Sequence, residues 1–162
     1  MALRITNPDQ PTDTDRAAIT APLRDYNEAH DGNPRLKPVA LLLTDTDGVQ
    51  RGGLWGRCVY DWLFVELLAV PEPHRGQGYG RALMHRAEDI ARAHGCIGLW
   101  LDTYEFQARG FYEKLGFTLF GTLDDHPVGR KRFFLQKRID RPVPDARPDT
   151  PTEDPPPHSM TG

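Results

Sequence analysis

The sequence lacks the features that define several large classes of protein. Its only two cysteines, Cys58 and Cys96, lie far apart and form no C-x-x-C pair, which excludes a disulfide framework and a thioredoxin-like motif. The longest apolar run is broken by Asp61 and Glu66 and is far shorter than a membrane span. The opening apolar stretch, residues 3–6, is too short for a signal peptide. We therefore expect a soluble, cytoplasmic protein with no membrane partner.

The sequence also lacks an excess of charge of one sign. The formal net charge is −3, so no strong field would draw the chain to nucleic acid. Histidines such as His74, His85 and His94 are scattered, without H-x-H or H-E-x-x-H spacing. We therefore expect neither a nucleic-acid partner nor a metal.

Composition divides the chain into one domain and a tail. Residues 1–139 fall within the usual size of a single domain. The last 22 residues, from Arg141, contain seven prolines and few apolar side chains. Such a segment cannot bury enough surface to offset the entropy lost on ordering. We therefore predict that residues 140–162 form a disordered, Pro-rich tail.

Hydrophobic periodicity predicts an α/β fold within the first 139 residues. Apolar runs and turn residues predict a mixed, twisted sheet, and apolar spacing of three and four residues predicts helices. One strand–helix–strand unit in the middle of the chain predicts a parallel pair. The expected strands are 3–6, 39–44, 49–60, 63–70, 97–101, 117–123 and 132–136, and the expected helices are 16–30, 80–94 and 106–115.

A glycine-rich stretch joins the strand at 63–70 to the helix at 80–94. Residues 70–81 read VPEPHRGQGYGR, with glycines at three alternate positions. Glycine adopts conformations closed to other residues and lets a ligand approach the main chain. Amides at a helix N-terminus favour negative charge, and Arg75 and Arg81 add positive charge. The stretch therefore predicts a cradle for phosphate or diphosphate.

Two common phosphate-binding motifs have a spacing that differs from this one. A P-loop is excluded because no lysine follows any of the glycines. The dinucleotide motif G-x-G-x-x-G would need its third glycine at Arg81, and five residues separate the strand from the turn. However, Asp102 follows at about the distance of a ribose-binding acid. A nucleotide-binding redox protein therefore stays open as an alternative.

The spacing Arg75-x-x-Gly78-x-Gly80 closely resembles the acyl-coenzyme A motif of the GNAT superfamily of N-acetyltransferases. A second block, residues 108–117 (ARGFYEKLGF), is similar to the family's later helix with its Tyr-x-x-x-Gly-Phe ending. The order and separation of the blocks also fit, and the resemblance extends over about residues 3–139. Glu105 stands where most such proteins have an Asn.

The resemblance implies a three-layer GNAT-like fold, with six to seven strands and helices on both faces of the sheet. It also implies an N-acetyltransferase that carries acetyl from acetyl-CoA to a primary amine of a small molecule, by direct attack in a ternary complex. A homodimer is common among such folds. The resemblance implies that the main chain from Leu68 to Val70 binds the pantetheine arm, and that the Val70 amide polarises the thioester carbonyl. The diphosphate would be held by Arg75, Gly76, Gln77, Gly78, Tyr79, Gly80 and Arg81.

Tyr112 and Glu66 are the candidate catalytic residues. A phenol of ordinary pKa, about 10, stays protonated at neutral pH and can donate to a departing thiolate. Strand alternation predicts that Glu66 shares a face with Phe64, Leu68 and Val70, an apolar setting that would raise its pKa towards that of a useful base. Alternatively, Tyr112 is a core aromatic and Glu66 a structural carboxylate.

Weaker candidates for the base are Asp102, Glu105 and His126, and water could also take the proton. Asp124 and Asp125 could attract an ammonium group or form a solvated turn. A non-catalytic acyl-CoA-binding or regulatory module is the second functional alternative. The acceptor amine, the base and the oligomeric state are not determined by the sequence.

Overall fold

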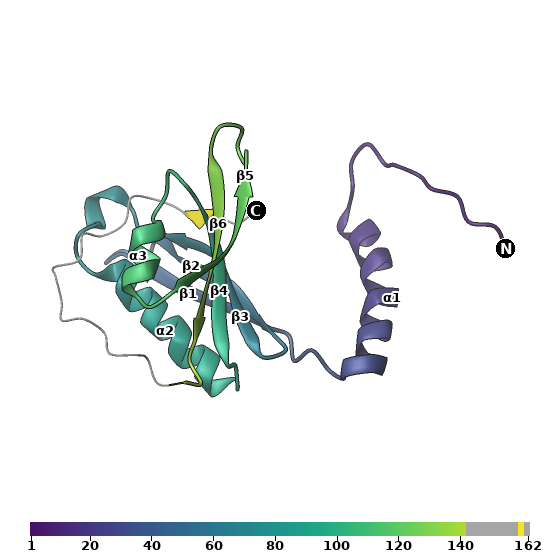
Figure 1. Ribbon diagram of the computed structural model, residues 1–162, viewed down its shortest axis with the longest axis horizontal. Coiled ribbons are helices and arrows are strands. Elements are labelled where there is room, and N and C mark those ends of the chain that lie inside the picture. Colours follow the sequence, from purple (N-terminus) through teal and green to yellow (C-terminus); the bar gives the residue numbers. More distant parts are fainter. Residues whose placement is uncertain (142–158, 161–162) are drawn as a thin grey trace. The chain divides into compact units, whose positions relative to one another are not determined.

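The structure is a computed structural model, and it describes residues 1–141 and 159–160 (Figure 1). These residues divide into two compact units, Met1–Pro34 and Arg35–Gly162, and each is described by itself. The tail predicted for residues 140–162 falls mostly outside the described residues. Within it, Ser159–Met160 form a short strand, β7.

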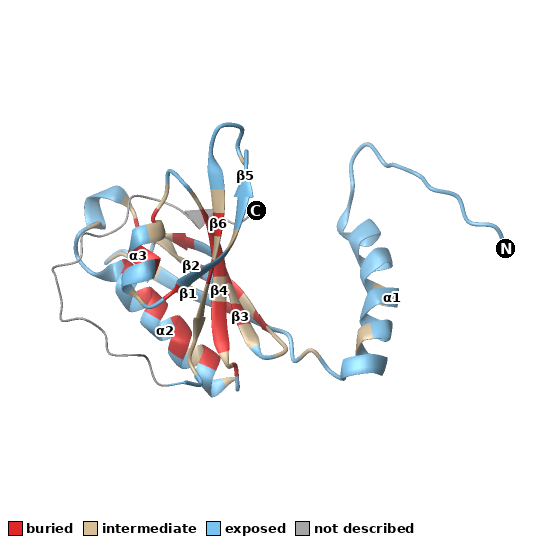
Figure 2. Cartoon of the chain, in the orientation of Figure 1, coloured by how far each residue is buried: buried red, intermediate tan, exposed pale blue. Residues whose placement is uncertain are grey.

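The first unit contains one helix, α1 (Asp13–Asp31). It begins earlier than predicted because Thr12 caps it in a capping box with Asp15. Pro22 lies inside the helix without dividing it. Residues 3–6 form no strand, so that prediction was wrong; they have no strand partner within their unit. Every residue of α1 is exposed or half-buried (Figure 2), and no helix among residues 1–141 is long and apolar enough to cross a membrane.

The second unit contains the sheet. Its strand order is β1-β2-β3-β4-β6-β5, with β7 paired to β3. Among the strands that the structure describes, only β3 and β4 run parallel, as the strand–helix–strand unit predicted, and the other neighbours are antiparallel. The predicted mixed sheet of six to seven strands is therefore confirmed. The strands are β1 (Lys37–Thr44), β2 (Gln50–Val59), β3 (Trp62–Ala69), β4 (Gly98–Tyr104), β5 (Thr118–Asp124) and β6 (Lys131–Arg138).

Two helices bury their apolar sides against this sheet (Figure 1). The longer, α2 (Tyr79–Ala93), inserts Leu83, Met84 and Ala87 into the core between it and β1–β4. The shorter, α3 (Arg109–Lys114), contributes Phe111 and Tyr112 to the same core. A single 3-10 turn, η1 (Glu72–His74), precedes the start of α2. The segment between β3 and α2 is thus anchored to this core.

A β-bulge at Glu66 changes the direction of the side chains along β3. Val65 faces Gly56 on β2 and Leu67 faces Trp55, so Glu66 is an extra residue with no opposite partner. Before the bulge, Leu63 and Val65 are buried; after it, Leu68 and Val70 are buried. Strict alternation therefore fails at this point, and the inward-facing positions change from odd to even numbers.

The two cysteines, Cys58 and Cys96, are both buried and both free. Burial, and then the neighbouring Cys58 thiol, raise the pKa of Cys96 to about 12. A thiol that stays protonated is a poor nucleophile, because the thiolate is the reactive form. Cys96 therefore serves as a small apolar residue of the core.

Candidate active site

The turn between β3 and α2 is held in shape by left-handed glycines and by bonds within the turn. Gly76 and Gly78 have φ angles of 76° and 84°, a region that glycine adopts without strain. The Arg75 Nε donates to the Val70 carbonyl at 3.2 Å, and the Gln77 amide nitrogen donates to the Pro73 carbonyl at 3.2 Å. These bonds therefore hold the turn in shape without a ligand.

The same turn leads directly into the N-terminus of α2. Gly78 is the N-cap residue and has no side chain to satisfy the first-turn amides. By helix geometry these amides have no acceptor inside the helix, and the helix dipole adds positive potential there. A Cβ added at Gly76 or Gly78 would meet no other atom within 4 Å. The glycines thus leave open space at a helix end that is suited to an anion.

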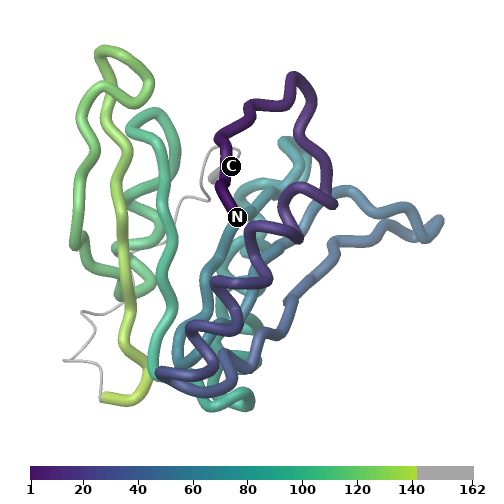
Figure 3. Tube along the Cα trace, turned by 90° about the vertical axis from the view of Figure 1, so that its right-hand side faces the viewer, coloured from purple at the N-terminus to yellow at the C-terminus, as the bar shows by residue number. Residues whose placement is uncertain are grey.

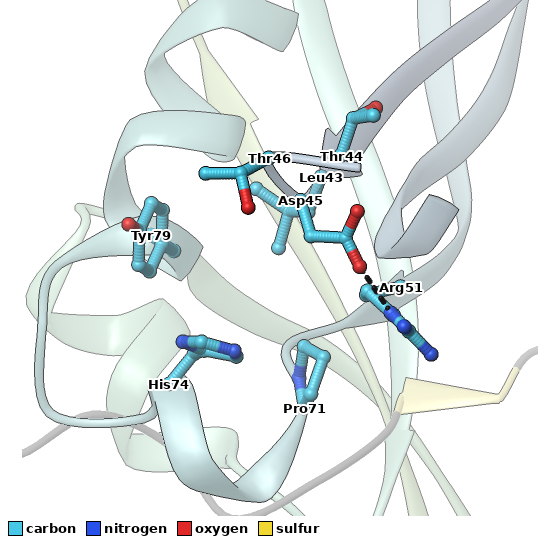
Figure 4. Close-up of a pocket in the computed structure, with 8 residues that line it drawn as sticks. All are labelled: Leu43, Thr44, Asp45, Thr46, Arg51, Pro71, His74 and Tyr79. Atoms are coloured by element: carbon cyan, nitrogen blue, oxygen red, sulfur yellow. Dashed lines mark hydrogen bonds and ion pairs between the residues drawn. The ribbon is translucent and has the colours of Figure 1, made fainter. Parts of the chain in front are cut away.

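A pocket of about 350 Å³ opens beside this turn (Figure 4). Its walls come from the η1 turn, the start of α2 and the β1–β2 hairpin. Within it, the Arg51 guanidinium pairs with Asp45 at 2.7 Å and lowers the pKa of that carboxyl, as the Val49 backbone amide does to a lesser extent. The pocket is lined by Leu43, Thr44, Asp45, Thr46, Arg51, Pro71, His74 and Tyr79.

Strands β3 and β4 separate just before the glycine turn. Their parallel pairing begins at Trp62 and Gly98 and ends at Val65 and Leu101, and the two strands diverge beyond that point (Figure 3). The next residues of β3 pair with β2 along one edge. Along the other edge, Leu67 and Leu68 pair with β7. The predicted pantetheine path therefore lies along a strand edge that accepts an extended main chain.

Tyr112 lies in α3 and is only 1% exposed. Its ring packs edge-to-face against Phe111 and Phe117, with centroids 5.1 Å and 6.0 Å away. It belongs to the same buried cluster as Leu68 and Val70 of β3. The structure thus brings Tyr112 and the end of β3 into one core, and the ring also has the packing of a core aromatic.

The prediction that Glu66 shares a face with Leu68 and Val70 was wrong, whereas the predicted shared face with Phe64 agrees with the register of β3. The bulge separates Glu66 from the buried side chains of Leu68 and Val70, because it reverses the alternation just after Glu66. The carboxylate is instead paired with the Arg57 guanidinium from β2, and its side chain is 19% exposed. Arg57 also lies over the Phe64 ring, which stacks on Trp100 with centroids 3.8 Å apart. Glu66 is therefore part of an aromatic and charged surface on the face away from α2.

A buried ion pair lies at the end of β4. Asp102 is 2% exposed and accepts from the Nε and Nη2 of Arg132 on β6, at 2.7 and 2.6 Å. Arg132 also bonds to the Tyr104 hydroxyl and to His126 Nε2, at 3.4 and 3.0 Å. Burial raises the pKa of Asp102, and Arg132 opposes that rise. Two of the weaker candidates for the base, Asp102 and His126, are thus joined through an arginine.

No role for Arg132 was predicted from the sequence, although the pattern of residues along β6 indicates where its side chain lies. Arg132, Phe134 and Gln136 alternate with the buried Phe133 and Leu135 along β6. That alternation puts Arg132 on the face opposite the core, where Asp102 of β4 also points. Glu105 accepts from the Lys131 backbone amide at 3.1 Å and so closes the same end of the sheet.

Next to the Asp102–Arg132 pair, the sheet carries an aromatic hollow of about 450 Å³. Phe120 enters it from a bulge in β5, where Leu119 and Gly121 face consecutive residues of β6. The hollow offers ring faces to a ligand. It is lined by Trp62, Trp100, Phe120, Phe134 and Gln136.

Comparisons with known proteins agree with this geometry. The model of the acetyltransferase (GNAT) family matches residues 6–117, more than half of the chain. The chain belongs to the GNAT acetyltransferase family. It is therefore an acetyl-CoA-dependent acetyltransferase, which removes the basis for a nucleotide-binding redox protein. Among residues 1–141 and 159–160, no group of three His, Cys, Asp or Glu could hold a metal ion.

Individual relatives support the acetyltransferase assignment. Acetyltransferase Atu2258 of Agrobacterium fabrum is 39% identical over 122 residues, 75% of this chain and 89% of that protein. Blasticidin-S acetyltransferase of Streptomyces morookaense is 42% identical over 93 residues, 57% of this chain and 68% of that protein. A crystal structure assigned as an acetyltransferase from Agrobacterium tumefaciens has a TM-score of 0.77 and 33% identity, covering 85% of this chain and 100% of that one.

The glycine turn between β3 and α2 gives a first testable prediction. Gly78→Ala is expected to weaken CoA binding by about tenfold, or about 1.4 kcal/mol. The new methyl group would strain the left-handed backbone and enter the open space that is predicted to receive the diphosphate. Isothermal titration with CoA measures this.

Gly129→Ala is the matched control, because Gly129 has a φ of 81° and equally open surroundings in the β5–β6 loop. It should lose similar stability and keep its CoA affinity. Equal CoA affinity in the two variants would contradict the role given to the turn.

Proposed function

We propose that the protein N-acetylates a primary amine of a small molecule, by direct attack on acetyl-CoA in a ternary complex. One observation carries this proposal. The β3–β4 pairing stops at Val65 and Leu101, and the edge of β3 that β4 leaves there runs towards the glycine turn at Arg75–Arg81. An extended pantetheine arm on that edge would deliver its diphosphate to the amides and arginines of the turn.

The chain's own groups can account for each step of acetyl transfer. The amine nitrogen attacks the thioester carbonyl carbon, and the Val70 amide donates to the developing oxyanion. The carbon–sulfur bond then breaks, and the thiolate of CoA takes the proton of the Tyr112 hydroxyl. The attacking nitrogen becomes positively charged and gives one proton to a base. Solvent then reprotonates Tyr112. No covalent enzyme intermediate is needed.

Glu66 is the proposed base, directly or through one water. It lies on the β3 bulge, at the point where the strand leaves β4, and its carboxylate is oriented by Arg57. A base at this position would stand on the face of the sheet opposite α2, so the amine would approach from the side away from that helix. The aromatic rings of Phe64 and Trp100 border the same approach.

Two observations support a class of acceptor. One is the aromatic surface on the face of the sheet away from α2, and the other is the identity of one relative. Aromatic ring faces attract cationic groups, and the nearby carboxylates of Asp102 and Glu66 are each balanced by an arginine, so the rings would supply most of this attraction. Blasticidin-S acetyltransferase is 42% identical over 93 residues. An amine-bearing antibiotic such as blasticidin S is therefore the first acceptor to test.

A screen for CoA-thiol release tests the proposed function. The full chain is mixed with acetyl-CoA and a panel of amines that includes blasticidin S, polyamines, amino acids and short peptides. We expect release with at least one small amine and an N-acetyl product by mass spectrometry. If CoA raises the melting temperature but no amine supports release, the non-catalytic acyl-CoA-binding module is favoured instead.

Glu66→Gln tests the base. It should lower kcat/KM by about tenfold at neutral pH, a modest loss for general-base catalysis because water can still accept the proton. Glu113→Gln is the control, since Glu113 forms a similar ion pair with Arg109 on the surface of α3. An unchanged kcat/KM in Glu66→Gln would assign the base elsewhere.

A further inference from the structure

The chain places its own C-terminal segment against the strand edge near the glycine turn. In antiparallel register, Leu67 pairs with Met160 and Leu68 pairs with Ser159. The opposite edge of β3 is already filled at these residues, because Leu67 and Leu68 also pair with Trp55 and Leu54 of β2. Strand β7 must therefore lie on the side of β3 that faces β4. It also lies against β4 itself.

This edge is the one that the proposed function assigns to the pantetheine arm. The β3–β4 pairing ends at Val65 and Leu101, so the next residues of β3 have main-chain groups that β4 does not reach. Pantetheine carries two amides in an extended arm, and a peptide strand offers the same donors and acceptors. A strand edge that binds one extended chain can bind the other by the same main-chain hydrogen bonds. The two cannot occupy Leu67 and Leu68 together.

We propose that the C-terminal segment, through Ser159 and Met160, is an internal competitor of acetyl-CoA. The inference rests on the proposed use of this edge by pantetheine. With β7 paired to Leu67–Leu68, the coenzyme must displace it before the thioester reaches the end of β3. The concentration of free acetyl-CoA would then set the fraction of enzyme with the edge open.

The expected strength of this competition is modest. Two-residue strand pairing is weak by itself, but a tethered segment acts at an effective concentration in the millimolar range. When only a fraction of the protein is competent to bind, the apparent dissociation constant rises in inverse proportion to that fraction. A closed state that is populated at about half to nine-tenths therefore weakens CoA binding about two- to tenfold.

Truncation after residue 158 tests the competition. CoA should bind the truncated protein about two- to tenfold more tightly in isothermal titration, and KM for acetyl-CoA should fall similarly. The double variant Ser159→Pro/Met160→Pro should behave like the truncation, because proline removes the amides that pair with β3. The double variant Ser159→Ala/Met160→Ala is the matched control. It keeps the main chain and should bind CoA like the full chain.

Hydrogen exchange without CoA tests the docking separately. Removing β7 should speed amide exchange within Leu67–Leu68 and leave exchange at Leu63, where β4 still pairs, unchanged. Unchanged exchange at Leu67–Leu68 would overturn the docking. Faster exchange with equal CoA affinity would overturn the competition alone. If neither chain binds CoA, the proposed function fails, and the exchange result still reports whether β7 pairs with β3.

Discussion

Tyr112→Phe is expected to lower kcat by about 100-fold or more, while the dissociation constant for CoA stays within about twofold. The substitution removes only the hydroxyl that is proposed to protonate the departing thiolate. The ring would keep its edge-to-face packing on Phe111 and Phe117, so the core around the end of β3 stays filled. Single-turnover CoA release, with a saturating acceptor found in the amine screen, measures the chemical step.

Two measurements separate this result from a structural effect. The loss of one buried hydroxyl group should change the free energy of unfolding by only about 1 kcal/mol. Tyr60→Phe, in the β2–β3 turn, removes a hydroxyl far along the chain from α3 and should leave kcat unchanged. If Tyr112→Phe turns over at the wild-type rate, Tyr112 is a core aromatic and the thiolate takes its proton from elsewhere.

Arg132→Met is expected to cost about 3–5 kcal/mol in the free energy of unfolding near neutral pH. The Asp102 carboxylate is 2% exposed and would lose its guanidinium partner, while methionine keeps much of the arginine's apolar volume. Urea unfolding followed by far-UV circular dichroism measures the loss. Arg138→Met is the control: its pair with Asp140 is exposed to solvent, so little stability should be lost.

The loss in Arg132→Met should depend on pH in a defined direction. Burial already raises the pKa of Asp102, and removing Arg132 takes away the main influence that lowers it. The folded carboxyl would then hold its proton more tightly than the unfolded one, whose pKa is about 3.9. Stability should therefore fall as pH rises from about 4 through the raised folded pKa, and be lowest above it.

A second substitution tests that explanation. Arg132→Met/Asp102→Asn should recover part of the lost stability above about pH 6, because an amide carries no charge to bury. It should also flatten the pH dependence. A loss in Arg132→Met that is the same at about pH 4 and pH 8 would show that packing, and not the buried charge, causes it.

Local patterns predicted the parts of this protein that depend on short-range order. The periodicity of residues 80–94 and the glycines at 76 and 78 were sufficient to predict α2 and the turn before it. The parallel pair followed from the strand–helix–strand order. Residues 3–6 looked like a strand by composition, yet a strand needs a neighbour to pair with, and composition says nothing about pairing.

The parts that failed depend on register between distant strands. Alternation predicts a regular β3, and the extra residue at Glu66 is visible only once Val65 and Leu67 are aligned with β2. The Asp102–Arg132 pair likewise joins residues thirty positions apart, through the register of β4 and β6. The pairing of Ser159 and Met160 with β3 could not be found from a tail whose composition predicts disorder.

The bulge in β3 also bears on how this protein can change during evolution. Because Glu66 has no residue directly opposite it on β2, mutation at this position breaks its ion pair with Arg57 but leaves the main-chain register of β2 and β3 unchanged. The positions that point away from α2, such as Phe64, can vary in size and charge without entering the packing of Leu63 or Val65. Substrate range could thus diversify through a few point mutations, while the foldability of the scaffold is conserved.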